Sequence, residues 1–188
     1  MKKIFIFMVG LIFIFSLSAT AQDRGGFGLK LGYFDPSDSD FDDYYGGGLT
    51  FGLNYLFPLG NDFNLETALD YFSKSKKFSY EGYSFDSDIT IMPVTLTLRY
   101  QPCVNLNLCP FFGAGLGYYY VTSEVSGFGD TDKESESDFG YHAVAGMDYK
   151  LGSGSFLAEL KWASAKIGDW DDAQVGGLTL SAGYRFTF

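Results

Sequence analysis

Apolar side chains recur at every second position of this sequence, in eight separate runs. In the last run, Leu178, Leu180 and Tyr184 fall on one side of an extended chain, whereas Thr179 and Ser181 fall on the other. Alternation with a period of two indicates β-strands, and no 3.6-residue period indicates a helix. We therefore predict an all-β chain without helices. The eight runs cover residues 26–34, 47–57, 63–78, 88–101, 110–123, 139–151, 156–167 and 176–188.

Two kinds of connector alternate between these runs. Short connectors alternate strictly with connectors that are mostly longer, polar and acidic, and this order predicts an antiparallel up-and-down meander with two different ends. We call them the short-turn end and the long-loop end. The short connectors are 58–62, 102–109 and 152–155, and the others are 35–46, 79–87, 124–138 and 168–175.

The polar face of the predicted strands carries charges that a protein core would have to desolvate, at several kcal/mol for each unpaired ion. The lumen of a small membrane barrel is polar and tolerates them. This argues against a soluble sandwich, which would also alternate. The charged residues with this parity are Lys30, Glu66, Asp70, Arg99, Asp148, Lys150, Glu159, Lys161 and Arg185.

The apolar face carries aromatic residues at both ends, as expected of a barrel that faces lipid. Lipid cannot hydrogen-bond an exposed strand edge, so the first strand must pair with the last. We predict an eight-stranded antiparallel up-and-down transmembrane β-barrel. The aromatic residues are Phe27, Phe57, Phe63, Tyr100, Phe112, Tyr149, Phe156 and Phe188 at the short-turn end, and Tyr33, Tyr71, Tyr118, Tyr120, Tyr141 and Trp162 at the other.

The N-terminus has the pattern of a secretory signal peptide. Lys2 and Lys3 precede an apolar segment over 4–15, and small residues stand at Ala19 and Ala21. This pattern predicts a signal peptide over 1–21 and a barrel domain over 22–188. The alternative is a membrane anchor, but the apolar segment is shorter than the roughly 20 residues of a spanning helix.

Three segments resemble a known family. PFFGAGLGY (110–118), FGYHAVAGMDY (139–149) and LSAGYRFTF (180–188) are similar, in this order, to the OmpA/OmpX-like porin family of small eight-stranded outer-membrane barrels. The resemblance implies a multi-pass protein of the bacterial outer membrane, in contact with its lipid and lipopolysaccharide. It also implies that Gly183, Phe186 and Phe188 belong to the C-terminal signal that the outer-membrane assembly machinery recognises. The family name does not imply conduction.

The charges of the polar face suggest a plug. An eight-stranded barrel is just wide enough for side chains to fill its interior, so we predict a cross-barrel network in the periplasmic half. We expect Glu66 to pair with Arg99 and Glu159 with Arg185 on adjacent strands; the alternative is a gated ion path. The predicted lumen network is Lys30, Glu66, Asp70, Arg99, Asp148, Glu159, Lys161 and Arg185.

Acidic residues crowd the long-loop end, which should face outward. This crowding is self-repulsive unless the loops are well solvated or bind divalent cations such as Ca²⁺, which takes several carboxylate oxygens. The spacing Asp38-x-Asp40-x-Asp42 lacks the Gly and distal Glu of an EF-hand. These residues are Asp35, Asp38, Asp40, Asp42, Asp43, Glu81, Asp86, Asp88, Glu124, Asp130, Asp132, Glu134, Glu136, Asp138, Asp169, Asp171 and Asp172.

Two lysines near the outer rim, Lys77 and Lys166, have lipid-facing parity and could pair with lipopolysaccharide phosphates. The net charge of −10 argues against a nucleic-acid partner, because binding a polyanion needs a basic surface.

Few residues suggest chemistry. Cys103 and Cys109 lie in one short turn, and an oxidising periplasm favours a disulfide between them. Some outer-membrane barrels are lipid A hydrolases with a Ser two residues after a His, but His142 is followed there by Val144 and has lumen parity. We therefore expect an interior histidine and no catalytic residues, no metal site and no cofactor.

These observations favour a structural and surface-interaction role for a monomeric barrel that is not an enzyme. A narrow channel for small solutes or ions is the main alternative, and an adhesin acting through 124–138 is a third hypothesis.

Overall fold

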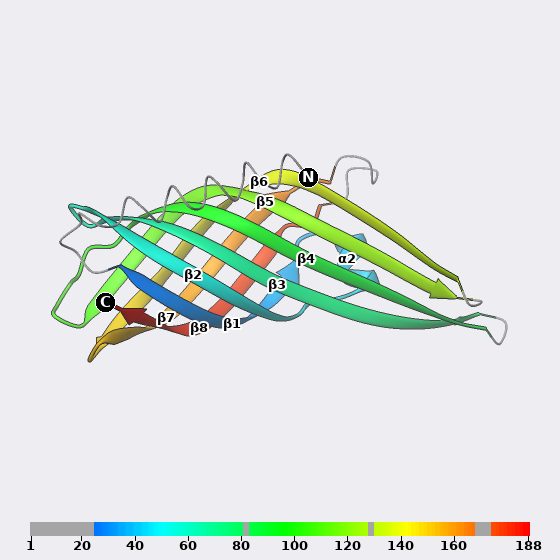
Figure 1. Ribbon diagram of the computed structural model, residues 1–188, viewed down its shortest axis with the longest axis horizontal. Helices are drawn as coiled ribbons and strands as arrows, with labels where there is room; N and C mark the ends of the chain where they lie inside the picture. The colour runs from blue at the N-terminus through cyan, green and yellow to red at the C-terminus, as the bar shows by residue number, and fades with distance from the viewer. Residues whose placement is uncertain (1–24, 81–82, 128–129, 168–173) are drawn as a thin grey trace.

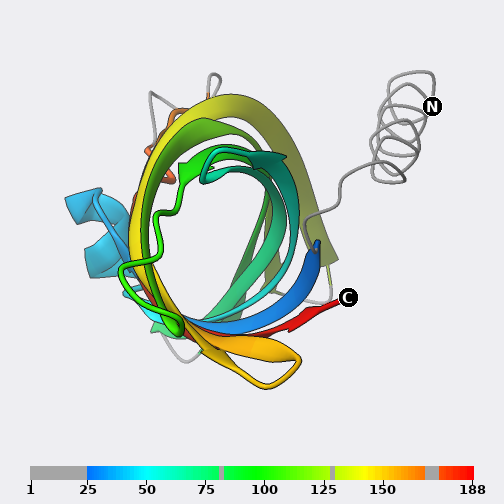
Figure 2. The same cartoon turned by 90° about the vertical axis from the view of Figure 1, so that its left-hand side faces the viewer.

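The computed structural model describes residues 25–80, 83–127, 130–167 and 174–188. Its eight strands form one closed antiparallel barrel in which each strand pairs with its neighbours in the chain (Figures 1 and 2). The predicted signal peptide over 1–21 lies outside the described residues. The elements are β1 (Gly26–Pro36), α2 (Ser39–Tyr44), β2 (Gly48–Gly60), β3 (Phe63–Tyr80), β4 (Tyr83–Tyr100), β5 (Leu108–Gly127), β6 (Asp130–Leu151), β7 (Gly154–Ala165) and β8 (Gly177–Thr187).

The first and last strands close the barrel. The register of β1 with β8 runs without a break from Gly26 opposite Thr187 to Pro36 opposite Gly177. A sheet that crosses a membrane must be closed in this way, because lipid offers no hydrogen-bond partner to a strand edge. The predicted eight-stranded up-and-down barrel is confirmed.

The four middle strands are longer than predicted. They have 18 to 22 residues, against 11 to 13 in the other four, and their hairpins project beyond the long-loop end (Figure 1). The prediction of loops over 79–87 and 124–138 is wrong. Outside the bilayer a strand needs no apolar stripe, so Ser- and Thr-containing segments pair as strands after the hydrophobic alternation has ended. We call residues 73–80, 83–91, 119–127 and 130–139 the surface sheet.

The connection between β1 and β2 holds a helix of six residues, α2, so the prediction of no helix is also wrong. Asp38 caps it: its Oδ1 accepts hydrogen bonds from the backbone N–H groups of Asp40 and Phe41, both at 3.0 Å. So short a helix cannot show a periodic apolar stripe. Its aromatic residue Phe41, together with Tyr45, packs against apolar side chains inside the barrel.

The outer wall of the barrel is apolar and exposed. Phe27, Phe156 and Phe188 are exposed toward the short-turn end, and Tyr141 and Trp162, whose rings lie 5.7 Å apart, toward the long-loop end. Phe57 departs from the predicted aromatic belts, because it is buried and packs on the ring of Tyr55 at 4.3 Å. Among the described residues, no helix is long and apolar enough to cross a membrane.

Candidate functional site

All eight residues of the predicted lumen network lie inside the barrel and are buried. They form two clusters, each with two cations and two anions, so that each cluster is electrically balanced. We call Glu66, Arg99, Asp148 and Arg185 the inner cluster, and Lys30, Asp70, Glu159 and Lys161 the central cluster.

The inner cluster is held by two arginines that share their carboxylates. Arg99 and Arg185 both donate to Oε2 of Glu66, the latter at 3.1 Å, and Arg185 also donates to Asp148. The structure thus places Glu66 beside Arg99, the pair expected from the sequence. The guanidinium of Arg99 lies 3.4 Å from the centre of the Phe111 ring, which adds a cation–π contact to its ion pairs.

The central cluster differs from the prediction. Glu159 accepts a hydrogen bond from Lys30 at 2.8 Å, and not from Arg185. The register explains why: Glu159 stands opposite Ser181, four residues from Arg185 along β8, and the small side chains of β8 leave room for Lys30 to reach across that strand. Asp70 lies 3.8 Å from Lys30 and also accepts from Lys161.

An open vestibule of about 530 Å³ leads from the short-turn end to the inner cluster, with Asp148 and Arg185 among its lining residues. Lys150, which has lumen parity, is exposed and lines this vestibule instead of joining the network. Because β6 ends at Leu151, the side chain at position 150 has already left the barrel interior.

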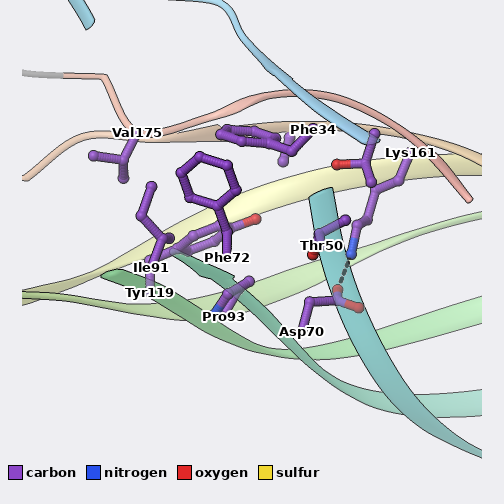
Figure 3. A pocket seen from close by; sticks show the side chains of 11 residues that line it. Phe34, Thr50, Asp70, Phe72, Ile91, Pro93, Tyr119, Lys161 and Val175 are labelled. Atoms are coloured by element: carbon purple, nitrogen blue, oxygen red, sulfur yellow. Dashed lines mark hydrogen bonds and ion pairs between the residues drawn. The ribbon is translucent and has the colours of Figure 1, made fainter. Parts of the chain in front are cut away.

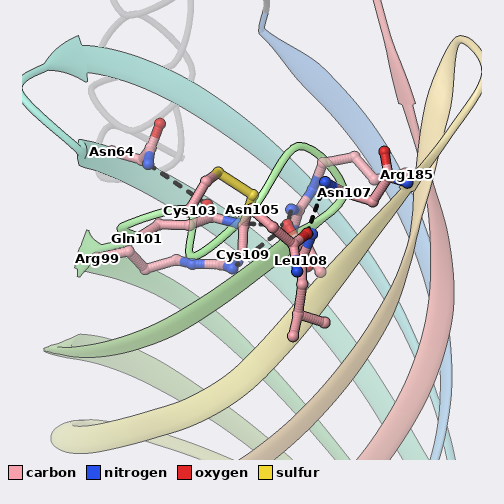
Figure 4. Close-up of a disulfide and its surroundings, with 10 residues drawn as sticks. Asn64, Arg99, Gln101, Cys103, Asn105, Asn107, Leu108, Cys109 and Arg185 are labelled. Carbon is pink, nitrogen blue, oxygen red and sulfur yellow. Dashed lines mark hydrogen bonds and ion pairs between the residues drawn. A yellow bond between two sulfur atoms is a disulfide. The ribbon is translucent and has the colours of Figure 1, made fainter.

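The predicted disulfide between Cys103 and Cys109 is present at the same end (Figure 4). Oδ1 of Asn105 accepts hydrogen bonds from the backbone N–H groups of Asn107 and Leu108, at 2.9 and 2.8 Å. Both cysteines line the vestibule. The disulfide therefore staples a compact turn at the mouth of the barrel.

A second closure, which the sequence did not predict, lies toward the long-loop end. Apolar side chains from five strands and from the connection between β7 and β8 pack in the lumen there, and Phe34 and Phe72 meet edge to face at 5.1 Å. The alternation of the sequence does indicate that these apolar side chains point into the lumen. Phe72 lies on the same face of β3 as Asp70, and Ile91 lies on the same face of β4 as Arg99. The cluster, which we call the apolar closure, is Phe34, Phe72, Ile89, Ile91, Tyr119, Val121, Ala163, Ala165, Ile167 and Val175.

Between the two closures lies a cavity of only about 40 Å³ (Figure 3). Asp70 and Lys161 line its charged side, and Phe34, Phe72 and Tyr119 its apolar side. A space of this size holds a few water molecules at most. This cavity therefore has no room for a sizeable ligand.

His142 lies in the lumen, as its parity predicts. Its Nε2 is 2.8 Å from the hydroxyl of Thr97, and Val144 packs in a small apolar cluster with Phe111 and Leu157. Within the described ranges, no group of three His, Cys, Asp or Glu residues is arranged to hold a metal ion. Asp38, the first residue of the spacing that was compared with a calcium-binding loop, is the N-cap of α2.

The surface sheet has two different faces. Its concave face continues the lumen and carries the β6 residues Asp132, Glu134, Glu136 and Asp138, which stand opposite Val125, Ser123, Val121 and Tyr119 of β5. Over the described residues, β7 pairs with β6 only from Gly140 onward, so β6 has one strand neighbour along 130–139. The predicted acidic residues Glu81, Asp169, Asp171 and Asp172 lie outside the described residues.

Together, a closed eight-stranded sheet, an apolar outer wall and a lumen that holds buried charges define an integral outer-membrane β-barrel. The family model "Outer membrane protein beta-barrel domain" matches residues 7–186, and the chain belongs to this family of bacterial outer-membrane proteins. The short turns of such barrels face the periplasm and the long hairpins face outward.

Solved structures share this fold at low sequence identity. Ail of Yersinia pestis, in complex with the heparin analogue sucrose octasulfate, is 21% identical with a TM-score of 0.54, over 87% of this chain and 100% of that one. Neisserial surface protein A is 16% identical with a TM-score of 0.59, over 88% and 97%. OprG of Pseudomonas aeruginosa is 19% identical with a TM-score of 0.57, over 87% and 96%. No curated protein matches the chain.

Proposed function

We propose that this protein is a non-conducting barrel that anchors the surface sheet in the outer membrane for interaction with a cationic partner. The observation that carries this proposal is the double closure of the lumen, by ion clusters on the periplasmic side and by the apolar closure on the outer side. A path for ions would have to break both.

The ion clusters support a plug because their members are buried and mutually paired. Removing one partner leaves an uncompensated buried charge, which costs about 3–5 kcal/mol. Thermal fluctuation therefore opens such a cluster rarely. The competing function, a narrow channel, would be favoured only if both closures could rearrange together.

The acidic concave face supports the surface role. Its β6 carboxylates make no ion pair with a cation of the described residues. Ail was crystallised with the heparin analogue sucrose octasulfate, whereas the four carboxylates along β6 repel polyanions and suit a cationic surface. Lys74 and Lys76, on the β3 part of the same face, donate hydrogen bonds to the backbone carbonyls of Gly47 and Asp43. An adhesin acting through residues 124–138 is one form of this role, and those residues belong to the hairpin of β5 and β6.

Other expectations remain part of the proposal. The exposed rings of Phe186 and Phe188 and the position of Gly183 in β8 suit a C-terminal strand that the assembly machinery reads in lipid. Lys77 and Lys166 remain candidates for binding lipopolysaccharide phosphates. Nζ of Lys77 lies 3.4 Å from a carboxylate oxygen of Asp86. We also propose that divalent cations screen the acidic hairpins, and that the protein is a monomer without enzymatic activity.

The surface role can be tested by adsorption. Vesicles that carry the protein are added to surfaces coated with poly-lysine or with heparin, and wild type should bind the former alone. Glu134→Lys with Glu136→Lys, on the concave face, should abolish that binding. Asp88→Lys, on the opposite face of the same sheet, is the matched control and should retain it. Equal binding by all three proteins would refute the proposed face.

A further inference from the structure

The vestibule at the short-turn end has the size of a binding pocket for a small molecule. Its volume of about 530 Å³ falls within the range of such pockets, roughly 300–1,000 Å³. The inner cluster lies at its inner end, and its mouth opens at the end of the barrel that faces the periplasm. A small molecule in the periplasm therefore has access to side chains of the inner cluster.

Two side chains at the inner end of the vestibule have polar atoms without a partner. Asp148 and Arg185 line the vestibule and are only 3% and 1% exposed. Oδ2 of Asp148 accepts hydrogen bonds from Gln101, at 2.7 Å, and from Arg185. In contrast, Oδ1 of Asp148 and Nε of Arg185 have no hydrogen-bond partner among the described residues. Burying a free acceptor and a free donor costs free energy, so a ligand that supplies a partner for each would be stabilised here.

Hydrogen bonds of the backbone fix two further parts of the wall. The N–H group of Gln101 donates to the carbonyl of Asp62 at 2.8 Å, and the N–H group of Lys150 donates to the carbonyl of Asn107 at 2.7 Å. Asn107 lies inside the turn that the disulfide closes. The main chain at Asp62 and at Lys150 is thus held in place before any ligand arrives, which lowers the entropy that binding would cost.

Opposite charges stand at the mouth of the vestibule. Asp62, between β2 and β3, and Lys150, near the end of β6, are exposed and line it. Neither forms an ion pair with another residue in the part of the chain that the structure describes. Together with Asp148 and Arg185, the lining has two anions and two cations. A balanced lining attracts neither polyanions nor polycations, and its separate charges suit a zwitterion.

We propose that the vestibule binds a short zwitterionic peptide from the periplasm. An amide group has its N–H donor and its C=O acceptor on separate atoms, as is needed to meet Oδ1 of Asp148 and Nε of Arg185 together. The carboxylate end of the peptide pairs with Lys150, and its ammonium end with Asp62. A neutral saccharide leaves both of these charges without a partner. This inference rests on the orientation of the barrel in the membrane, and neither on the closed lumen nor on the cationic partner.

The test measures ligand binding to the folded protein in phospholipid nanodiscs by saturation-transfer NMR. The probes are trialanine, the same peptide with an acetylated N-terminus and an amidated C-terminus, and maltotriose. The blocked peptide keeps the amide groups but has no charged ends. Asp148→Asn retains one oxygen for Gln101 and Arg185 and puts an NH₂ group in place of the free acceptor. Lys150→Ala removes a charge of the mouth, and Lys133→Ala, an exposed lysine at the outer end, is the matched control.

Trialanine should bind saturably to wild type and to Lys133→Ala, and the blocked peptide should bind several-fold more weakly. Lys150→Ala should narrow this difference between the two peptides, whereas Asp148→Asn should lose most of the binding of both. If Asp148→Asn fails to give the folded, heat-modifiable form, Lys150→Ala still tests the site, because Lys150 is exposed and outside the inner cluster.

Three results would overturn the proposal. The first is no saturable binding of trialanine to wild type, which would mean that water alone meets the free atoms of Asp148 and Arg185. The second is binding of maltotriose or of the blocked peptide as tight as that of trialanine. The third is equal binding of trialanine by wild type and by Lys150→Ala.

Discussion

Lys30 of β1 donates a hydrogen bond to Glu159 of β7 at 2.8 Å, and this pair spans β8, the strand on which the barrel closes. Both side chains are almost fully buried. The ion pair therefore links the first strand of the barrel to a strand that is 129 residues away in the sequence.

Replacing Lys30 by Met should destabilise the barrel by about 3–5 kcal/mol, because Glu159 is left buried without its cation. Adding Glu159→Met should recover most of this loss, since a buried ion pair can often be replaced by apolar side chains at little cost. Urea unfolding in lipid vesicles measures both. Lys133→Met is the control: its partner Glu124 is exposed, and the loss should stay below about 1 kcal/mol. A double variant as unstable as Lys30→Met alone would contradict the account.

Tyr119→Phe should leave the barrel as stable as wild type or stabilise it by about 1 kcal/mol, because a buried hydroxyl without a partner costs free energy. The hydroxyl of Tyr119 is buried inside the apolar closure and has no hydrogen-bond partner among the described residues. Tyr120→Phe, on the exposed side of the same strand, is the matched control. A clear loss of stability for Tyr119→Phe in the same urea assay would show that the hydroxyl is satisfied.

Replacing Cys103 and Cys109 by Ser should cost about 2 kcal/mol or less, which is the loop-closure entropy expected for so short a loop. The two residues are six positions apart and lie at the periplasmic mouth. Reduction of the wild type should produce the same shift in the urea midpoint. If the variant failed to form the folded, heat-modifiable barrel, the disulfide would be required for folding, and the prediction of a small stabilising effect would be wrong.

Opening the lumen should require changes in both closures. Phe34→Ala with Phe72→Ala removes the edge-to-face contact of the outer closure, and Glu66→Ala with Arg99→Ala removes one ion pair of the inner cluster. The quadruple variant should show stable openings in a planar bilayer, whereas each double variant should show few or none. Lys150→Ala, at the exposed rim of the vestibule, is the control and should stay closed.

The sequence alone predicted most of the barrel wall and the inward direction of the buried charged side chains. Alternation placed Lys30, Arg99 and Arg185 inside, because the period of two fixes the face of every residue in a strand. It did not predict that Glu159 pairs with Lys30, since the partner depends on the register between strands and on the small residues of β8. The number of residues between Lys30 and Glu159 in the sequence does not determine this register.

Two features were missed for different physical reasons. The hairpins of the surface sheet lie beyond the bilayer, where water contacts both faces of a strand. Apolar and polar residues need not alternate there, so the sequence over 124–138 has the pattern of a loop. Polar residues alone do not predict the apolar closure, because Phe72 follows Asp70 on the same face of β3 and also points into the lumen. A barrel interior holds both kinds of side chain, as long as they fill it.

The conductance of the unmodified protein in a planar bilayer tests the central claim, a lumen closed twice, most directly. The account predicts a silent bilayer at moderate voltage, even when heat-modifiable mobility shows that the inserted protein is folded. Steady unitary openings of the wild type, recurring at one amplitude, would contradict it.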